Sequence, residues 1–287
     1  LDVSGLVVTP GIVDMHTHVY TFAPTPESCV RGMHADAHLL SSGVTTTVDA
    51  GTAGWRDFPD FVERCIEPST VRILAFVNIA ARGMLHGPSE QSERELDPRM
   101  AAAVAGAYPH LVVGVKTAHY WTSRPWDAEH RPWTSVDRAL DAGERCGKPV
   151  MVDFWPRPPE RPYPELILRK LRPGDIHTHV FAQQFPIVAP DGRLFDHLFR
   201  ARERGVRFDL GHGAASFWFR NAVPALEQGF PPDTISTDFH AANVNGPVLG
   251  MLATMSKCLA MGMPLGEVIA RSTVEPAAAI RRPELGT

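Results

Sequence analysis

The stretch GIVDMHTHVY, residues 11–20, sets two histidines one residue apart at the end of a short apolar run. In an extended strand, side chains two residues apart point to the same side, so the His16 and His18 imidazoles can converge on one metal ion. Asp14 lies on the same face of the predicted strand. Hydrogen-bonded or surface histidines also occur at this spacing, and the pair by itself leaves both interpretations open.

Further β-rich apolar runs follow along the chain. Most successive runs begin about 25 to 40 residues apart, the length of a strand, a helix and two connections, which indicates parallel strands with crossover helices. After the first run at 12–15, the predicted strands cover 44–48, 71–77, 111–115, 150–152, 175–178, 206–210 and 234–237. Helices are predicted at 26–43, 58–68, 134–147, 194–205 and 219–229.

The positions of unusual polar residues decide which α/β fold this spacing describes. A (β/α)8 barrel of the TIM type gathers chemistry at the carboxyl ends of many strands, whereas a doubly wound open sheet concentrates it at one switch point. Here the later strands also end at or beside polar residues, which are Lys116, Asp153, His179, His212 and Asp238. The sequence therefore predicts a (β/α)8 barrel with its site at that end.

Two of these residues are costly to bury without a partner. Lys116 ends an apolar strand, and a salt bridge or a side chain that reaches solvent would explain it without any site. The Asp238 carboxylate needs a metal, an arginine or several hydrogen-bond donors, unless it caps a helix. His179 is compatible with a metal ligand or with a hydrogen-bonded core histidine, and His177 lies two residues earlier on the same face.

Composition favours small-molecule chemistry in the cytoplasm. A formal net charge of −4 provides no basic surface for nucleic acid, and no apolar run approaches the ~20 residues of a membrane span. Four cysteines lie far apart without a CxxC pair, which favours free thiols and a reducing compartment. The chain of 287 residues begins without Met inside an extended segment, so we treat it as the central piece of a longer protein.

The ordered set of HxH, strand-end Lys, strand-end His and strand-end Asp resembles the amidohydrolase superfamily of metal-dependent hydrolases. The stretches that carry the resemblance span essentially the whole chain and are similar to its dihydroorotase-like deacetylase branch: PGIVDMHTHVY, GVTTTVDAGTAG, GDIHTHVF, DLGHGAASFWFR and PDTISTDFH. The resemblance implies that residues 1–287 form a (β/α)8 barrel with a binuclear zinc site. It also implies a small β-sandwich domain, whose segments we expect outside this chain.

The same resemblance implies a role for each site residue. His16 and His18 would hold the more buried metal ion, and a carbamylated Lys116 would bridge both ions. His179 would bind the second ion. Asp238 would be a ligand of the buried ion and the general base.

One position departs from the family pattern. The family places a histidine at the end of the fifth strand, where this chain has Asp153. A carboxylate can ligate Zn²⁺ and suits harder ions such as Mn²⁺ better. Asp153 therefore either replaces the imidazole as a ligand or leaves the second ion weakly held.

The implied reaction is the hydrolysis of an amide, cyclic amide or ester bond of a small molecule. A hydroxide generated at the metal attacks the carbonyl carbon, and Asp238 passes the proton from the nucleophile to the leaving nitrogen or oxygen. Two alternatives stay open. One is a heterocycle deaminase, and the other is a metal-binding barrel that has lost catalysis, for which Asp153 is the argument.

Substrate contacts are predicted on the loops that follow the strands. His212 and Arg220 flank a Gly-rich loop that can bring His212 over the site, although a structural role at a helix end explains His212 equally well. Aromatic residues including Tyr120 and Trp121 suggest an apolar or aryl group in the substrate, and Arg157 suggests an acidic one. Loop tryptophans also pack against partner subunits, and we expect a homo-oligomer.

Overall fold

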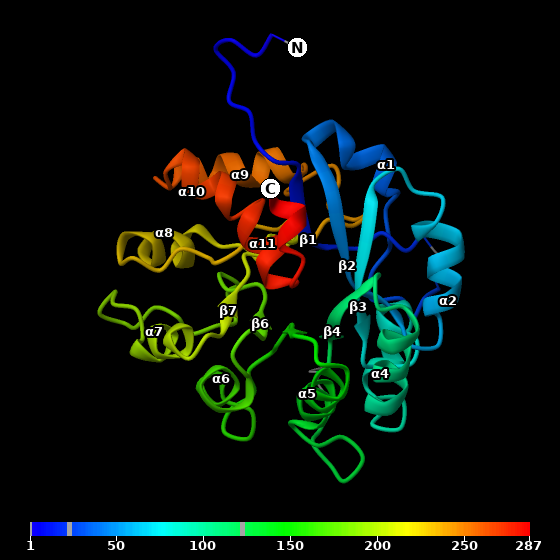
Figure 1. The fold of residues 1–287 in the computed structure, drawn as a ribbon. Helices are drawn as coiled ribbons and strands as arrows, with labels where there is room; N and C mark the ends of the chain where they lie inside the picture. Colours follow the sequence, from blue (N-terminus) through cyan, green and yellow to red (C-terminus); the bar gives the residue numbers. More distant parts are fainter. Residues whose placement is uncertain (1, 22–24, 121–123) are drawn as a thin grey trace.

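The computed structural model describes residues 2–21, 25–120 and 124–287. At its centre is a parallel sheet in which each strand is hydrogen-bonded to the next one along the chain (Figure 1). The seven strands are β1 (Ile12–Thr17), β2 (Val44–Gly54), β3 (Arg72–Asn78), β4 (Val112–Thr117), β5 (Val150–Val152), β6 (Ile176–His177) and β7 (Arg207–Phe208). Each overlaps a predicted strand, and the curled parallel sheet confirms the predicted barrel class.

The eighth predicted strand, at 234–237, pairs with the segment after β7, and Phe239 just beyond it pairs with β1, without a regular strand forming. On one side, the N–H of Leu210 donates to the carbonyl oxygen of Thr234 at 2.9 Å. On the other side, the N–H of His18 donates to the carbonyl oxygen of Phe239 at 2.9 Å. This segment therefore joins the region after β7 to β1.

Most helices surround the sheet on its outside, whereas α11 packs against the cluster that the sheet encloses (Figure 1). They are α1 (Ala35–His38), α2 (Phe58–Phe61), α3 (Gly87–Glu90), α4 (Pro98–Ala107), α5 (Thr134–Cys146), α6 (Tyr163–Glu165), α7 (Asp196–Glu203), α8 (Phe219–Glu227), α9 (Met251–Ala260), α10 (Leu265–Ala270) and α11 (Val274–Ala279). Short 3-10 or π turns form η1 (Leu40–Ser42), η2 (Val62–Ile66), η3 (Gly83–Leu85), η4 (Leu166–Lys170) and η5 (Pro283–Gly286). None of the helices in the described part of the chain has the length and apolar character needed to cross a membrane.

Four of the five predicted helices are confirmed, as α2 with η2, α5, α7 and α8. The prediction of a single helix over 26–43 is wrong, because only the short α1 and η1 form there. The residues before α1 make hydrogen bonds to distant parts of the chain instead of to their own helix. The N–H of Cys29 donates to the Met84 carbonyl and that of Met33 to the His18 carbonyl, both at 2.9 Å. These tertiary contacts override the local helical pattern.

The sheet encloses one apolar cluster and is covered by another. The outer cluster fills the space between the strands and the helices. The inner cluster joins the strands to the end of the chain around α11 and comprises Val13, Met15, Val48, Ala50, Leu74, Phe76, Val113, Met151, Ile176, Ala277, Ala279 and Ile280. Packed side chains therefore fill the barrel near α11, as is typical of this architecture.

Candidate active site

A cavity of about 230 Å³ lies at the carboxyl ends of the strands. Its walls bring together all the residues predicted as metal ligands, which are His16, His18, Lys116, Asp153, His179 and Asp238. A larger hollow of about 620 Å³ lies beside α4 and α5, and its walls are mostly charged surface side chains. We place the candidate site in the smaller cavity, because only there do ligating groups from several strand ends converge.

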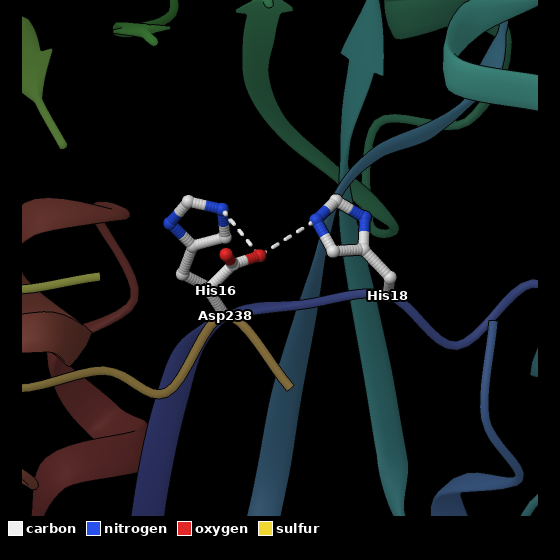
Figure 2. A group of neighbouring side chains, drawn as sticks. All are labelled: His16, His18 and Asp238. Atoms are coloured by element: carbon white, nitrogen blue, oxygen red, sulfur yellow. Dashed lines mark ion pairs between the residues drawn. The ribbon is translucent and has the colours of Figure 1, made fainter. Parts of the chain in front are cut away.

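His16, His18 and Asp238 form a close group in this cavity (Figure 2). One ligand atom from each of them lies within 4.8 Å of the others. Oδ1 of Asp238 is 3.5 Å from Nε2 of His16 and 3.0 Å from Nε2 of His18. Both histidines are 1% exposed, so these polar atoms are almost completely removed from water.

A hydroxyl and a carboxylate fix the orientation of the His16 ring. Nδ1 of His16 lies 2.8 Å from Oγ1 of Thr178, and that hydroxyl donates to Oδ2 of Asp209 at 2.8 Å. Because the hydroxyl proton is committed to the carboxylate, the hydroxyl oxygen must accept from Nδ1–H of His16. The unprotonated nitrogen is then Nε2, which faces the cavity.

His18 is held by the same arrangement on the other side. Its Nδ1 lies 2.8 Å from Oγ1 of Thr52, which donates to Oδ2 of Asp49 at 2.8 Å. The hydroxyl is again the acceptor, so Nδ1 of His18 carries a proton and Nε2 points at Asp238. Two separate hydroxyl–carboxylate pairs therefore present both Nε2 atoms to one place.

His179 presents a third Nε2 to the cavity. Its Nδ1 donates to the carbonyl oxygen of Gly211 at 2.6 Å, since a carbonyl can only accept. Its Nε2 lies 3.8 Å from Oδ2 of Asp153. The imidazole–carboxylate pairing at the first site is thus repeated, with a longer separation, at the position where the sequence departs from the family pattern.

This donor set fits a divalent cation. An imidazole Nε2 lone pair and a carboxylate oxygen repel each other unless a proton or a metal ion lies between them. Burial lowers the pKa of His16 to about 3, so its ring is neutral at physiological pH. Burial alone would raise the pKa of Asp238, but a proton on the facing imidazoles, His18 first, takes the place of a metal ion and holds that pKa well below its usual range. A neutral imidazole beside an ionised carboxylate is the protonation state that binds zinc.

Lys116 ends β4 inside the cavity and is 1% exposed. Its Nζ lies 3.4 Å from Nε2 of His16 and 3.5 Å from Sδ of Met151. Burial lowers the pKa of Lys116, which favours the neutral amine. Gly51, with φ of 81°, provides the space for its stem, because a Cβ there would lie 2.6 Å from Cβ of Lys116.

Two site residues have left-handed backbone conformations that are unusual outside glycine. His179 has φ of 60° and Asp238 has φ of 51°. A glycine packs against each: a Cβ at Gly211 would lie 2.8 Å from Nδ1 of His179, and one at Gly213 would lie 2.5 Å from Oδ2 of Asp238. Backbone strain of this kind persists where the surroundings hold a functional side chain in place.

Tyr120 and Arg157, predicted substrate residues on the loops after β4 and β5, do not line this cavity, whereas His119 and Trp155 on the same loops do. Tyr120 is fully buried, and its hydroxyl donates to the Arg131 carbonyl at 2.8 Å. The Arg157 guanidinium lies 4.2 Å from the centre of the Trp126 ring. Trp121 lies outside the described residues. A substrate role for Tyr120 and Arg157 stays a prediction.

His212 and Arg220 do not line the cavity either. His212 turns towards α9, where its Nε2 lies 2.7 Å from Nζ of Lys257, and its ring stacks on Phe217. The Arg220 guanidinium lies 4.6 Å from the centre of the half-buried Trp218 indole. Their role in substrate binding also stays a prediction.

Sequence reasoning missed residues that support or line the site. His240 lines the cavity and its ring lies 6.2 Å from that of His18, centre to centre. It follows Asp238 by two residues, so the spacing that singled out His16 and His18 could have found it. The Thr178–Asp209 and Thr52–Asp49 pairs left no comparable signal, because the histidines that they orient are distant from them in the sequence.

Comparison with known proteins gives consistent relatives. No model of a known protein family matches the chain. A curated protein named deacetylase from Brucella anthropi is 35% identical over 287 residues, which cover 98% of this chain and 68% of the relative. A solved structure described as an adenine deaminase superposes with a TM-score of 0.83 at 26% identity, over 97% of this chain and 73% of the other. One described as a dihydroorotase gives 0.79 at 32% identity, over 95% and 73%.

Proposed function

The chain belongs to the amidohydrolase superfamily as a metal-dependent hydrolase of small molecules, and from that premise we propose that it cleaves an amide, cyclic amide or ester bond. The observation that supports this chemistry best is the convergence of three imidazole Nε2 atoms with two carboxylates in one cavity. The relatives named deacetylase and dihydroorotase act within this reaction class.

We assign the metal to His16, His18 and Asp238, with zinc as the ion that suits an imidazole and carboxylate set. A divalent ion in such a site acts as a Lewis acid and lowers the pKa of water from about 15.7 towards about 7. The Thr178–Asp209 and Thr52–Asp49 pairs hold the two rings in the ligating orientation. Loss of such supporting groups typically weakens metal affinity about 10- to 100-fold.

Asp238 is the proton carrier in this proposal. Its Oδ1 faces the two imidazoles, which leaves Oδ2 on the side of Gly213 to accept the proton of the attacking water. The same oxygen then returns the proton to the leaving nitrogen or oxygen of the substrate. The ionised state of Asp238 at neutral pH is the form that this role requires.

Lys116 and Asp153 belong to a second metal position in the proposal. Burial favours the neutral amine of Lys116, which can add carbon dioxide and release a proton to form a carbamate, an anionic ligand. Asp153 would replace the expected histidine beside His179. The 3.8 Å between Asp153 and His179 supports this pairing, and an oxygen ligand makes Mn²⁺ a competitor for zinc there. The β-sandwich segments, the homo-oligomer and the cytoplasmic location stay predictions.

Purified protein supplied with zinc and bicarbonate, and assayed on N-acyl amino acids and aryl acetates, tests the proposal. We expect turnover that chelation abolishes and zinc restores. Asp141→Asn, an exposed carboxylate on α5 paired with Arg145, is the matched control and retains full activity. Ammonia release from adenine without cleavage of any acyl compound would favour the deaminase alternative. Metal binding without any turnover would favour a barrel that has lost catalysis.

A further inference from the structure

A second group of ligating side chains lies beside the site. Cys29 in the loop after β1, Glu90 in α3 and His119 after β4 each place one ligand atom within 4.8 Å of the other two. Cys29 and His119 line the same cavity as His16 and His18. Neither the family resemblance nor the reaction proposed above uses these three residues.

The carboxylate of this group is firmly oriented. Glu90 is 2% exposed, and its Oε1 accepts a hydrogen bond from Nδ2 of Asn78 at 3.1 Å. Its Oε2 lies 2.9 Å from Nδ1 of His119. Asn78 is fully buried at the end of β3, so the strand itself aims the carboxylate at the imidazole.

The thiol is also positioned by its surroundings. The backbone N–H of Cys29 donates to the Met84 carbonyl at 2.9 Å, which ties its loop to η3. A Cβ at Gly87 would lie 2.9 Å from Sγ of Cys29, so the thiol packs directly over a residue that has no side chain. The Cys29 residue is exposed, and an ion from solvent can reach it.

A thiol, an imidazole and a carboxylate can form a nucleophile relay or a metal site, and the geometry separates the two. In a relay, the thiol and the carboxylate contact opposite nitrogens of the imidazole ring. Here Sγ of Cys29 and a carboxylate oxygen of Glu90 lie within 4.8 Å of each other. The three groups therefore converge on one point instead of forming a line.

We propose that Cys29, Glu90 and His119 bind a divalent zinc-like ion, separate from the ion held by His16, His18 and Asp238. Sulfur, nitrogen and oxygen donors in one set suit zinc, whereas Mg²⁺ and Ca²⁺ prefer oxygen alone. Three protein ligands leave a fourth coordination position open, as in catalytic zinc sites. Because Cys29 and His119 line the cavity, that position is accessible to a small anionic ligand from within it.

Cobalt loading under reducing conditions tests this proposal. Thiolate ligation gives Co²⁺ a sulfur-to-metal charge-transfer band in the near ultraviolet, which imidazole and carboxylate ligands do not give. We expect the band in the wild-type protein. The Cys29→Ser protein should lose the band and bind about one equivalent of cobalt less. The control Cys146→Ser, whose half-buried thiol lies at the end of α5, keeps the band. The His18→Ala protein loses the ion at the other site, but it should also keep the charge-transfer band.

A glycine pair tests the geometry without removing any ligand. Gly87→Ala would push the thiol away, and we expect at least a tenfold weaker cobalt titration of the band. Gly106→Ala, in α4 with no atom within 4 Å of the new Cβ, leaves the titration unchanged. A folded wild-type protein that binds cobalt without the band would overturn this proposal and leave the proposed hydrolysis intact. A protein that shows the band but has no hydrolytic activity would support this metal site and overturn the proposed hydrolysis.

Discussion

The two halves of the barrel hold their parts of the site in different ways. The strands β1 to β4 are 6, 11, 7 and 6 residues long, whereas β5 to β7 have 3, 2 and 2 residues. His16 and Lys116 lie on regular strands of the first half. His179 and Asp238 come from the second half, where both have positive φ.

In the second half, hydrogen bonds between buried side chains connect the segments where the backbone ladder between strands is short. The Asp209 carboxylate accepts hydrogen bonds from the hydroxyls of Thr178 at 2.8 Å, Thr234 at 2.7 Å and Ser236 at 2.8 Å. Asp14, on β1, accepts from the Thr237 hydroxyl at 2.6 Å. We infer that hydroxyl–carboxylate contacts fix the register there, which frees the backbone to adopt the left-handed conformations that the site needs.

Replacement of Asp238, the proposed proton carrier from the second half, should cause the largest loss of activity. Asp238→Asn keeps the shape of the side chain but cannot accept the proton, so we expect activity to fall by about 10²- to 10⁴-fold even with metal bound. Steady-state kinetics alongside metal analysis measures this. Wild-type turnover in a metal-loaded Asp238→Asn protein would remove Asp238 from its assigned role.

A matched pair of carboxylates compares the two halves directly. Asp209→Asn and Asp49→Asn each weaken a hydroxyl that orients a ligating histidine, and we expect about a 10- to 100-fold loss of zinc affinity from each. Their effects on folding should differ. Asp209→Asn should lower the free energy of unfolding by about 3 kcal/mol, because its charged hydrogen bonds replace a ladder.

Asp49 lies in β2, which remains paired with β1 and β3 when the charge is lost. We therefore expect a smaller loss of stability from Asp49→Asn. Urea unfolding of both apoproteins makes the comparison. Equal losses in the free energy of unfolding would contradict the idea that strand pairing stabilises the first half when the carboxylate charge is lost.

A glycine pair separates backbone strain from displacement of the site. Gly213→Ala places a Cβ 2.5 Å from Oδ2 of Asp238, so we expect roughly a tenfold loss of activity. The substitution should also lower the free energy of unfolding by about 1–2 kcal/mol, which is the strain that a left-handed alanine carries. Gly229→Ala has a similar positive φ with no atom within 4 Å of the new Cβ, and only the strain should remain. Similar activity in the two variants would refute the idea that Gly213 positions Asp238.

The last comparison concerns acid stability in the second half. His177 is fully buried among Tyr163, Phe185 and Phe208, and burial lowers its pKa to about 3. Between about pH 6.5 and 3 the unfolded chain binds a proton that the folded chain excludes, so His177 makes stability fall as the pH falls, by up to about 1.4 kcal/mol per pH unit. His177→Phe should flatten that slope. An unchanged slope from pH-dependent urea unfolding would contradict the assignment.

The sequence predicts the strands of both halves of the molecule but not the contacts between distant segments. Residues 44–48 and 150–152 could be predicted as strands because a buried strand is visible in the sequence as a local apolar run. The metal-ligand candidates could be found because each ends such a run. The roles of Asp209 and Asp49 could not be found, since the hydroxyls that they hold meet His16 and His18 only in three dimensions. The loop at 26–34 was mistaken for helix because its hydrogen bonds go to distant carbonyls.

Anomalous diffraction at the zinc edge from zinc-loaded crystals tests the central claim most directly. The account predicts a peak bounded by Nε2 of His16, Nε2 of His18 and Oδ1 of Asp238, the three atoms that the buried hydroxyl–carboxylate pairs and the strained backbone bring together. A zinc-loaded protein with full side-chain density at these residues and no anomalous peak among them would contradict it.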